Sequence, residues 1–363
     1  MSAPVITPTP DLAFSVPPSR EANAPSPLGN TPQTTRMLVA DRSSGRLQHA
    51  RLAELPAQLN PGDVVVVNTS KVLPAALPAA ASWTDELPGL RVHWSTALPG
   101  GSPDASGETV RAVIEVRRAA GATSTPFPDV GSGHELHLPA GGRATVSHRL
   151  RTGSRLWVAQ LRLPGGRDAY LERHGEPIRY GADTPRFPLR DVQTVFAQHP
   201  GSAEPPSAAL AFDGRLVADL IDRGIEVLPI TLHTGVASLE DHEPPYPEWF
   251  EVSTHTARRV RAAKAAGNRI VAVGTTVTRA LESSVDGDGL VRPAEGWTGL
   301  VIGPRHRPQV VDGLLTGWHE PGASHLAMLE AVADHDLLAA SYATAVADGY
   351  RWHAFGDLHL IRG

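Results

Sequence analysis

The segment 269–284, RIVAVGTTVTRALESS, restricts the possible folds of this chain more than any other part of the sequence. Residues 270–273 form a short apolar run, which is typical of a strand buried on both faces of a parallel sheet. Gly274 ends the run, and Thr275 and Thr276 can cap the helix that follows. This order places free backbone N–H groups at the carboxyl edge of a sheet, where a carboxylate or phosphate is favoured. The spacing alone favours an ordinary strand-to-helix turn. Whether the turn binds a ligand has to be judged from the other segments of the sequence.

Helices and strands alternate toward both ends of the chain. Near the start, 37–52 predicts two strands joined by a Ser-Ser-Gly turn, followed by a short helix and a buried strand at 64–67. Later segments continue the alternation and end in a strand, which implies a largely parallel sheet covered by helices. The expected elements are a helix at 207–224, a strand at 225–235, a helix at 254–267, strands at 299–304 and 309–317, a helix at 324–349 and a strand at 353–361.

Between about Leu77 and Leu163 the pattern changes to short alternating runs separated by Gly, Pro and Ser, which is typical of an antiparallel barrel or sandwich. The fold class is therefore α/β, with a discontinuous α/β main domain interrupted by an inserted antiparallel β-barrel. We predict that the main domain comprises 33–76 and 172–363 and that the barrel comprises 77–171. Residues 1–32 are rich in Pro and Ala without a hydrophobic period, which predicts a disordered tail.

Composition excludes several classes of protein. The chain has 363 residues, long enough for two domains, and no cysteine, which excludes disulfides and thiolate chemistry. No apolar run reaches transmembrane length and the start is not a secretory signal, so we expect a cytoplasmic protein without membrane contact. A net charge of −5 argues against a broadly basic nucleic-acid surface but leaves room for a local basic patch. P-loop, dinucleotide-binding and GxSxG motifs are absent from the sequence.

Two histidines lie where strands are predicted to end. His233 and Gly235 end the run 225–235, and His319 precedes a predicted helix with Ser324 as its cap. A histidine in such a place can exchange a proton near neutral pH, although a lone histidine at a strand end is more often structural.

Two further groups of side chains have a functional and an ordinary interpretation. Acidic and aromatic residues alternate in 239–252, which suits a flat base or a cation but also a charged surface loop. The spacing of His242 with Glu248 or His255 does not fit a helical zinc motif, so we predict no metal site. Several basic residues could together contact phosphate groups, although basic residues more often simply form a solvated face. They are Arg179, Arg258, Arg259, Arg261, Lys264, Arg305, His306 and Arg307.

Taken in order, these segments resemble one family, the S-adenosylmethionine:tRNA ribosyltransferase-isomerases of queuosine biosynthesis. The resemblance extends from about Arg36 to Ile361 outside the insert. It rests on RMLVADRSSG, PGDVVVVNTSKVLPA, HGEPIRY, VQTVFA, GIEVLPITLHTG, EWFEV, RIVAVGTTVTRALES, GWTGLVIGP, QVVDGLLTGWHEP and YRWHAFGDLHLI. The family fold is an α/β domain with an inserted β-barrel, in agreement with the pattern above.

The resemblance implies an enzyme that uses S-adenosylmethionine as a ribosyl donor. In the family reaction the aminomethyl group of a 7-deazaguanine in a tRNA anticodon attacks the ribose, giving epoxyqueuosine and releasing adenine and methionine. The sulfonium acidifies the C5′ protons, so that a positioned base can start the elimination of adenine. The resemblance implies catalytic roles for His233, Arg279, His319 and Asp312. It implies donor-binding roles for Gly274, Thr275, Thr276, Gln193, Thr194, Gly235, Thr316 and Trp249.

The chain also departs from the family pattern. Ala211 and Tyr246 stand where the family has histidines, and Lys71 replaces an arginine. The segment 31–36, TPQTTR, keeps Arg36 but lacks the acid of the family's first motif, Gly317 and Trp318 replace Asn and Phe, and 304–306 replaces a Pro-Gly-Tyr element. We therefore expect retained donor binding with either tRNA or a small molecule as acceptor, or cleavage of the donor alone. A non-catalytic RNA- or nucleoside-binding homologue is the alternative from another class. We expect a monomer without metal; the general base, the effect of the lost histidines and the role of the tail stay open.

Overall fold

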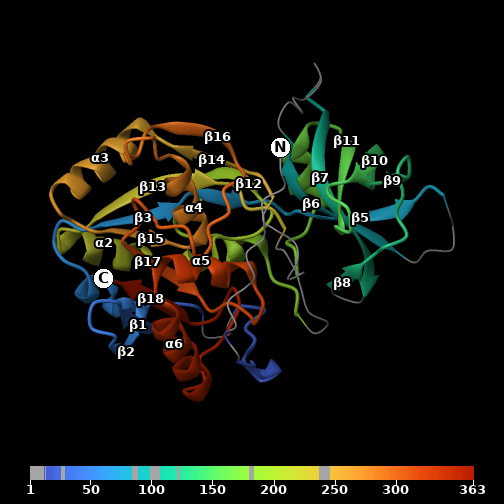
Figure 1. The fold of residues 1–363 in the computed structure, drawn as a ribbon. Helices are drawn as coiled ribbons and strands as arrows, with labels where there is room; N and C mark the ends of the chain where they lie inside the picture. The colour runs from blue at the N-terminus through green and yellow to red at the C-terminus, as the bar shows by residue number, and fades with distance from the viewer. Residues whose placement is uncertain are drawn as a thin grey trace.

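The computed structural model describes residues 12, 14–25, 29–83, 89–98, 107–120, 123–179, 184–236 and 246–363. A large α/β domain and a smaller β-barrel lie side by side (Figure 1). The chain enters the barrel after β4 (Ser70–Val72) and leaves it after β11 (Leu156–Arg162). The α/β fold with an inserted antiparallel barrel is thus confirmed, while the domain boundaries at 77 and 171 stay a prediction.

The α/β domain is built on a nine-stranded mixed sheet. Its four central strands, β13, β3, β15 and β17, are parallel, and antiparallel strands extend it on both sides. In sheet order the strands are β16 (Ala294–Thr298), β14 (Glu248–Val252), β13 (Glu226–Leu232), β3 (Val64–Asn68), β15 (Ile270–Val273), β17 (Gly313–Gly317), β18 (Leu358–Arg362), β1 (Arg36–Asp41) and β2 (Leu47–Arg51).

Helices cover both faces of this sheet, which is why its central strands consist of continuous apolar runs. In β3, Val64 and Val66 pack into the core beneath α3–α6, whereas Val65 and Val67 pack into the opposite core beneath α2. The helices are α2 (Gly214–Asp222), α3 (Thr254–Ala265), α4 (Thr275–Ser283), α5 (Ser324–Val332) and α6 (His335–Ala347).

Several expected elements have different bounds. The helix predicted at 207–224 is a short 3-10 turn, Ser207–Ala209, followed by α2, because Asp213 caps α2 through the N–H of Leu216. The helix predicted at 324–349 is divided into α5 and α6, since Asp334 caps α6. The strand predicted at 299–304 is wrong, because residues 299–303 form no ladder and the edge strand is β16.

The inserted domain closes into a six-stranded antiparallel barrel. The ladder β11-β10-β9-β5-β6-β7 is closed by pairing between β7 and β11, and β8 extends it beside β7. Its strands are β5 (Ala76–Ala81), β6 (Leu90–Ala97), β7 (Thr109–Ala120), β8 (Thr123–Pro126), β9 (Glu135–His137), β10 (Arg143–Arg149) and β11. Helix α1 (Arg167–His174) leads the chain back to the α/β domain.

A short two-stranded sheet lies at the junction, where β4 pairs in parallel with β12 (His199–Ser202). Strand β4 follows β3 in the chain, and its pairing with β12 brings the residues near 70 and those near 202 together. A hydroxyl of the barrel strand β6 reaches the same place, because Ser95 Oγ accepts the backbone N–H of Val236 at 3.1 Å.

The described residues of the N-terminal segment pack against the C-terminal part of the chain. Leu12 is buried, Phe14 stacks on Trp352 with ring centroids 5.5 Å apart, and Glu21 forms a bridge with Trp352. The disorder predicted for 1–32 stays a prediction, but the described residues of this segment pack through a few apolar side chains on an aromatic surface, which composition does not reveal.

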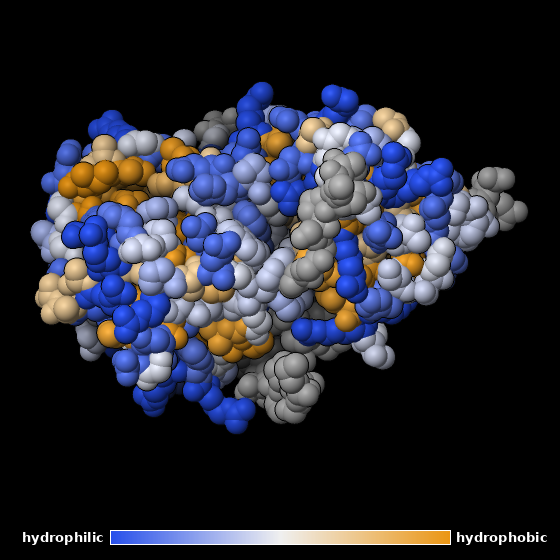
Figure 2. All heavy atoms as spheres, turned by 90° about the horizontal axis from the view of Figure 1, so that it is seen from above, coloured by the Kyte–Doolittle hydropathy of each residue, from blue (hydrophilic) through white to orange (hydrophobic). Residues whose placement is uncertain are grey.

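Figure 2 shows one face of the molecule, on which hydrophilic residues dominate and hydrophobic residues lie in separate small patches. Among the helices that the structure describes, none has both the length and the apolar character needed to cross a bilayer.

Candidate functional site

The four parallel strands end at one edge of the sheet, and most of the residues expected in the site lie there. The strand ends are Asn68 in β3, Leu232 in β13, Val273 in β15 and Gly317 in β17. In an open α/β sheet ligands bind at this carboxyl edge. The topology therefore brings together side chains from four distant parts of the sequence.

Gly274 turns the chain from β15 into α4. Its φ of 94° lies in the region that favours glycine, and it is itself the N-cap of the helix. The expectation that Thr275 and Thr276 cap the helix is wrong, because both lie inside its first turn and Gly274 occupies the cap. The two threonines are half-buried, beside backbone N–H groups that the helix itself leaves unpaired.

Asn68, which the sequence analysis did not select, fixes this turn. Its amide donates to the carbonyl of Leu232 at 2.9 Å and to Thr276 Oγ1 at 3.3 Å, and its Oδ1 accepts the N–H of Leu232 at 3.0 Å. One fully buried side chain thus joins β3, β13 and α4. Its position after the run of four valines was the available signal.

His233 follows β13 directly, and its ring lies between Trp249 and Gly201. Its ring stacks on Trp249 with centroids 5.0 Å apart, and a Cβ at Gly201 would lie 2.5 Å from three of its ring atoms. Its Nδ1 lies 2.8 Å from Ser70 Oγ. Burial, followed by the charges of Arg167 and His199, lowers the pKa of His233 to about 4. The ring is therefore neutral near neutral pH.

Gly235, two residues on, is fixed by a buried ion pair. Its N–H donates to Glu248 Oε1 at 3.0 Å, and Arg279 donates to the other carboxylate oxygen. Burial raises the pKa of Glu248, and the charge of Arg279 opposes that shift. Arg279 also donates to the carbonyls of Leu300 and Tyr246, so this buried side chain supports the loop around Gly235. A direct catalytic role for Arg279 stays a prediction.

The two residues that replace the family histidines, Tyr246 and Ala211, are both buried. Tyr246 is buried, and its hydroxyl donates to the carbonyl of Val236 at 2.6 Å and lies 2.9 Å from Ser95 Oγ in the barrel. Burial, with the charge of Glu248, raises the pKa of this hydroxyl well above its usual value. Ala211 is buried in the core beneath α2.

Thr316 and His319 lie at the end of β17. Thr316 Oγ1 is 3.0 Å from His319 Nε2, and the rings of His319 and His325 stack with centroids 4.6 Å apart. Burial, followed by the charge of His325, lowers the pKa of His319 well below its usual range. Burial, followed by the charge of Arg279, lowers the pKa of His325 to about 4. His325 had no sequence signal, and the expected cap at Ser324 is wrong because Ala323 is the N-cap of α5.

Gln193 and Thr194 lie beside the small sheet at the domain junction. The amide of Gln193 donates to the carbonyl of Val72 at 2.8 Å and accepts its N–H at 3.0 Å. Thr194 is buried, and its Oγ1 accepts the N–H of Phe196 at 3.3 Å. The contacts of Gln193 hold the end of β4, which carries Ser70. The hydrogen bond of Thr194 is local and does not reach β4. Donor-binding roles for both residues stay predictions.

Asp312 is not part of this edge. It precedes β17, at the amino end of the strand, where its carboxylate accepts Lys264 Nζ at 2.8 Å and the N–H of Ile270 at 2.9 Å. Thr316 lies at the opposite end of the same strand. This position does not favour the expectation that Asp312 faces the cleft, because residues 313–315 of the extended strand separate it from Thr316.

Several of the basic residues are already paired. Arg179 pairs with Glu176, Arg259 with Glu226 and Lys264 with Asp312. They are therefore poor candidates for a shared phosphate patch. In the acidic and aromatic segment 239–252, Asp241, His242 and Glu243 lie outside the described residues, whereas Trp249 lies on His233.

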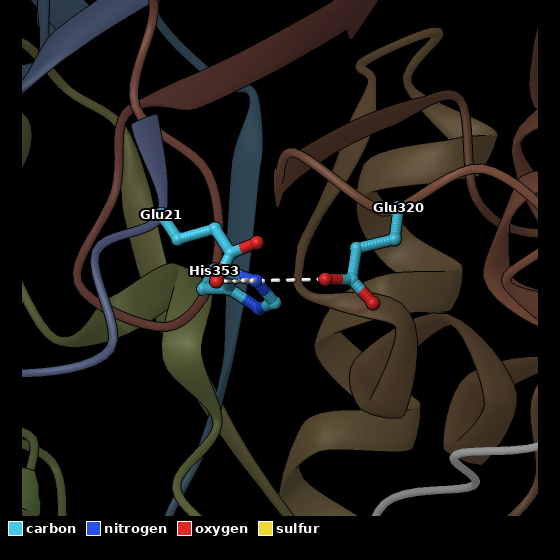
Figure 3. A group of neighbouring side chains, drawn as sticks. All are labelled: Glu21, Glu320 and His353. Atoms are coloured by element: carbon cyan, nitrogen blue, oxygen red, sulfur yellow. Dashed lines mark ion pairs between the residues drawn. The ribbon is translucent and has the colours of Figure 1, made fainter. Parts of the chain in front are cut away.

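The described residues bring one group of metal-ligand types together: Glu21, Glu320 and His353, whose ligand atoms lie within 4.8 Å of one another (Figure 3). His353 Nε2 is 2.8 Å from Glu320 and 3.9 Å from Glu21. Burial lowers the pKa of His353, but the hydrogen bond to Glu320 and the charges of Glu320 and Glu21 together outweigh burial, and the net shift of the pKa is upward. A protonated histidine between two carboxylates is an ion pair, and it ties the loop after His319 to the N-terminal segment.

Comparison with known proteins gives a consistent result. A family model described as "Queuosine biosynthesis protein" matches residues 9–361. The S-adenosylmethionine:tRNA ribosyltransferase-isomerase of Moorella thermoacetica is 33% identical over 368 residues, which cover 97% of this chain and 98% of that protein. The protein of the same name from Symbiobacterium thermophilum is 35% identical over 341 residues, covering 90% and 92%.

A solved structure is also similar. It is an S-adenosylmethionine tRNA ribosyltransferase from Thermotoga maritima, with a TM-score of 0.51 and 26% sequence identity. The alignment covers 96% of this chain and 98% of that one, so both domains contribute to the likeness.

Proposed function

The chain belongs to the queuosine biosynthesis protein family, and from this premise we propose that it transfers the ribosyl part of S-adenosylmethionine to 7-aminomethyl-7-deazaguanine in a tRNA anticodon. It is an enzyme of the transferase-isomerase type. The products of the proposed reaction are epoxyqueuosine in tRNA, adenine and methionine. The observation that carries the proposal is the gathering of the Gly274 turn, His233 and Thr316 at one sheet edge.

Each part of this edge suits one part of the donor. The first turn of α4 offers N–H groups and two half-buried threonines to the carboxylate of the methionyl group. Trp249, which stacks on His233 through one face, offers its other face to the sulfonium, which an aromatic ring favours. Thr316 and His319 lie across from them. The sulfonium itself supplies the positive charge that acidifies C5′, so the proposed chemistry needs no metal.

The test is a turnover assay of the purified protein with S-adenosylmethionine and tRNA that carries the aminomethyl base. Release of adenine and methionine only with this tRNA is the expected result. Unmodified tRNA is the matched control. A protein that binds S-adenosylmethionine in a calorimeter but releases nothing with any tRNA would contradict the proposal.

A second candidate keeps the donor and changes the acceptor to a small molecule. It is favoured by Tyr246, whose hydroxyl is committed to Val236 and Ser95, so that this position offers no histidine to an acceptor. Adenine release that requires no tRNA would support this candidate. A cytoplasmic location and a monomeric state stay predictions in either case.

A further inference from the structure

Two serines connect the ring of His233 to the backbone. Ser70 Oγ lies 2.8 Å from His233 Nδ1 and 2.5 Å from Ser202 Oγ. The backbone N–H of Thr234 donates to Ser202 Oγ at 2.9 Å. The four groups come from β4, from β12 and from the residues after β13. They form one continuous chain of hydrogen bonds at the carboxyl edge.

The chain has two possible directions. In the first, Ser202 donates to Ser70, Ser70 donates to His233 Nδ1, and the imidazole proton is on Nε2. In the second, His233 Nδ1–H donates to Ser70 and Ser70 donates to Ser202. Ser202 then accepts two hydrogen bonds, and its own proton needs a further acceptor.

Burial decides between the two directions. Ser202 is 0% exposed and Ser70 is 1% exposed. Ser202 Oγ has no other hydrogen-bond partner in the part of the chain that the structure describes. The second direction would leave a buried hydroxyl proton without an acceptor, which is unfavourable because the group has lost its hydrogen bonds to water. The first direction gives every proton of the chain a partner.

We propose that Ser202 and Ser70 are positioning residues that hold His233 as the neutral Nε2–H tautomer, so that it presents a hydrogen-bond donor to the ligand. The inference rests on the proposed function for the identity of that ligand. The recognised group is an uncharged acceptor of the nucleoside, a ribose oxygen or a ring nitrogen of the departing base. In this arrangement His233 stabilises charge that develops on the acceptor, and another group removes the C5′ proton.

The surroundings of the ring support this assignment. Trp249 on one side and the close approach of Gly201 restrict rotation of the ring, so that Nδ1 stays on Ser70. Nε2 has no hydrogen-bond partner among the described residues. Arg167 and His199 oppose a positive charge on the ring, whereas Asp168 acts in the other direction.

The tautomer can be measured without turnover. Protein labelled with 15N in histidine is examined near neutral pH by two-bond 1H–15N correlation, and His233→Gln identifies the signals of His233. The expected pattern has a protonated Nε2 and an unprotonated Nδ1. Ser70→Ala and, separately, Ser202→Ala should change it toward a mixture of tautomers. Ser43→Ala, whose hydroxyl bonds to Asp41 on the surface, should leave it unchanged. A proton on Nδ1 in the unmodified protein overturns the proposal.

A kinetic comparison tests the role of the donor. His233→Gln keeps an N–H donor but cannot act as a base, whereas His233→Glu offers a base without a donor. We expect the glutamine variant to retain more activity, and Ser70→Ala to lower kcat on the order of tenfold with little change in KM. Greater activity of the glutamate variant overturns the role. If the unmodified protein shows no turnover, the proposed function fails while the spectroscopic result still decides the tautomer.

Discussion

Arg279 and Glu248 form a buried ion pair in which the two side chains are 7% and 11% exposed. The pair joins the second turn of α4 to β14 and, through Glu248 Oε1, to the N–H of Gly235. The loop around Gly235 at the site edge therefore depends on the ion pair of Arg279 with Glu248. Substitution of these residues should mainly change stability, whereas substitution of ligand-contacting residues should mainly change activity.

Arg279→Ala should destabilise the protein strongly, because it leaves the Glu248 carboxylate and the carbonyls of Leu300 and Tyr246 without their donor. The expected loss in the free energy of unfolding is about 3–5 kcal/mol, measured by urea denaturation. Arg259→Ala, which breaks the exposed pair with Glu226, is the matched control and should cost far less than Arg279→Ala. Equal losses in the two variants would show that burial of the Arg279 pair contributes little.

Asp312→Asn should leave catalysis intact. Asp312 lies at the amino end of β17, and its pair with Lys264 is about a third exposed on each side. We expect kcat/KM within about twofold of the unmodified protein and a loss in the free energy of unfolding below about 1 kcal/mol. Thr316→Val, at the other end of the same strand, should lower kcat/KM on the order of tenfold. A large kinetic effect of Asp312→Asn would return this residue to the site.

The protein should lose stability in acid through its buried histidines. Burial lowers the pKa of His359 to about 3, and those of His233 and His325 are lowered to about 4. The unfolded chain binds these protons below about pH 6.5, whereas the folded protein does not, so stability is complete above about 6.5 and falls as the pH drops toward 4. Urea denaturation across this range measures the slope. A flat profile would contradict the lowered values.

His359→Phe should reduce that acid sensitivity. His359 is fully buried, stacks on Trp318 with centroids 4.7 Å apart, and neither ring nitrogen has a hydrogen-bond partner among the described residues. A phenylalanine keeps the stacking and removes two unsatisfied polar atoms, so we expect unchanged or higher stability, by up to about 1–3 kcal/mol. His335→Phe, at an exposed position, is the control. Marked destabilisation by His359→Phe alone would indicate a partner for the imidazole.

Tyr246→Phe should weaken the junction between the domains. The hydroxyl donates to Val236 and lies beside Ser95 of the barrel, and its loss leaves a buried carbonyl without a donor. We expect a loss in the free energy of unfolding of about 1–3 kcal/mol. Tyr350→Phe removes a hydroxyl that bonds to the exposed His49 and should cost less. Equal costs would show that the bridge to the barrel is not a significant contact.

Part of the fold followed from pattern alone. The run 270–273 coincides with β15 because a strand buried on both faces must be apolar throughout. The alternating runs after Leu77 correctly indicated a barrel. The predicted helices at 207–224 and 324–349 were too long, because Asp213 and Asp334 start new helices that hydrophobic content does not reveal.

The site was predictable only in part. His233 and Gly274 follow from the rule that ligands lie where parallel strands end, whereas Thr316 came only from the family resemblance. Ser70, Ser202 and His325 could not be selected, since the role of each depends on a partner more than one hundred residues away or on a ring stacked on it. Asn68 had a signal in its position after four valines, but its partners are equally distant in sequence. The role predicted for Asp312 stays a prediction that its position does not favour, because Asp312 and Thr316 lie near opposite ends of β17 although they are close in sequence.

The sequence by itself determined the local elements and the family, since apolar periodicity, glycine turns and colinear motifs are properties of neighbouring residues. Only the tertiary structure decided which side chains meet. The hydrogen bonds from Ser202 through Ser70 to His233 and the pair of Arg279 with Glu248 join separate segments. The strength of each of these contacts depends on burial, on the distance between donor and acceptor and on their alignment. These quantities are defined only after the sheet has assembled.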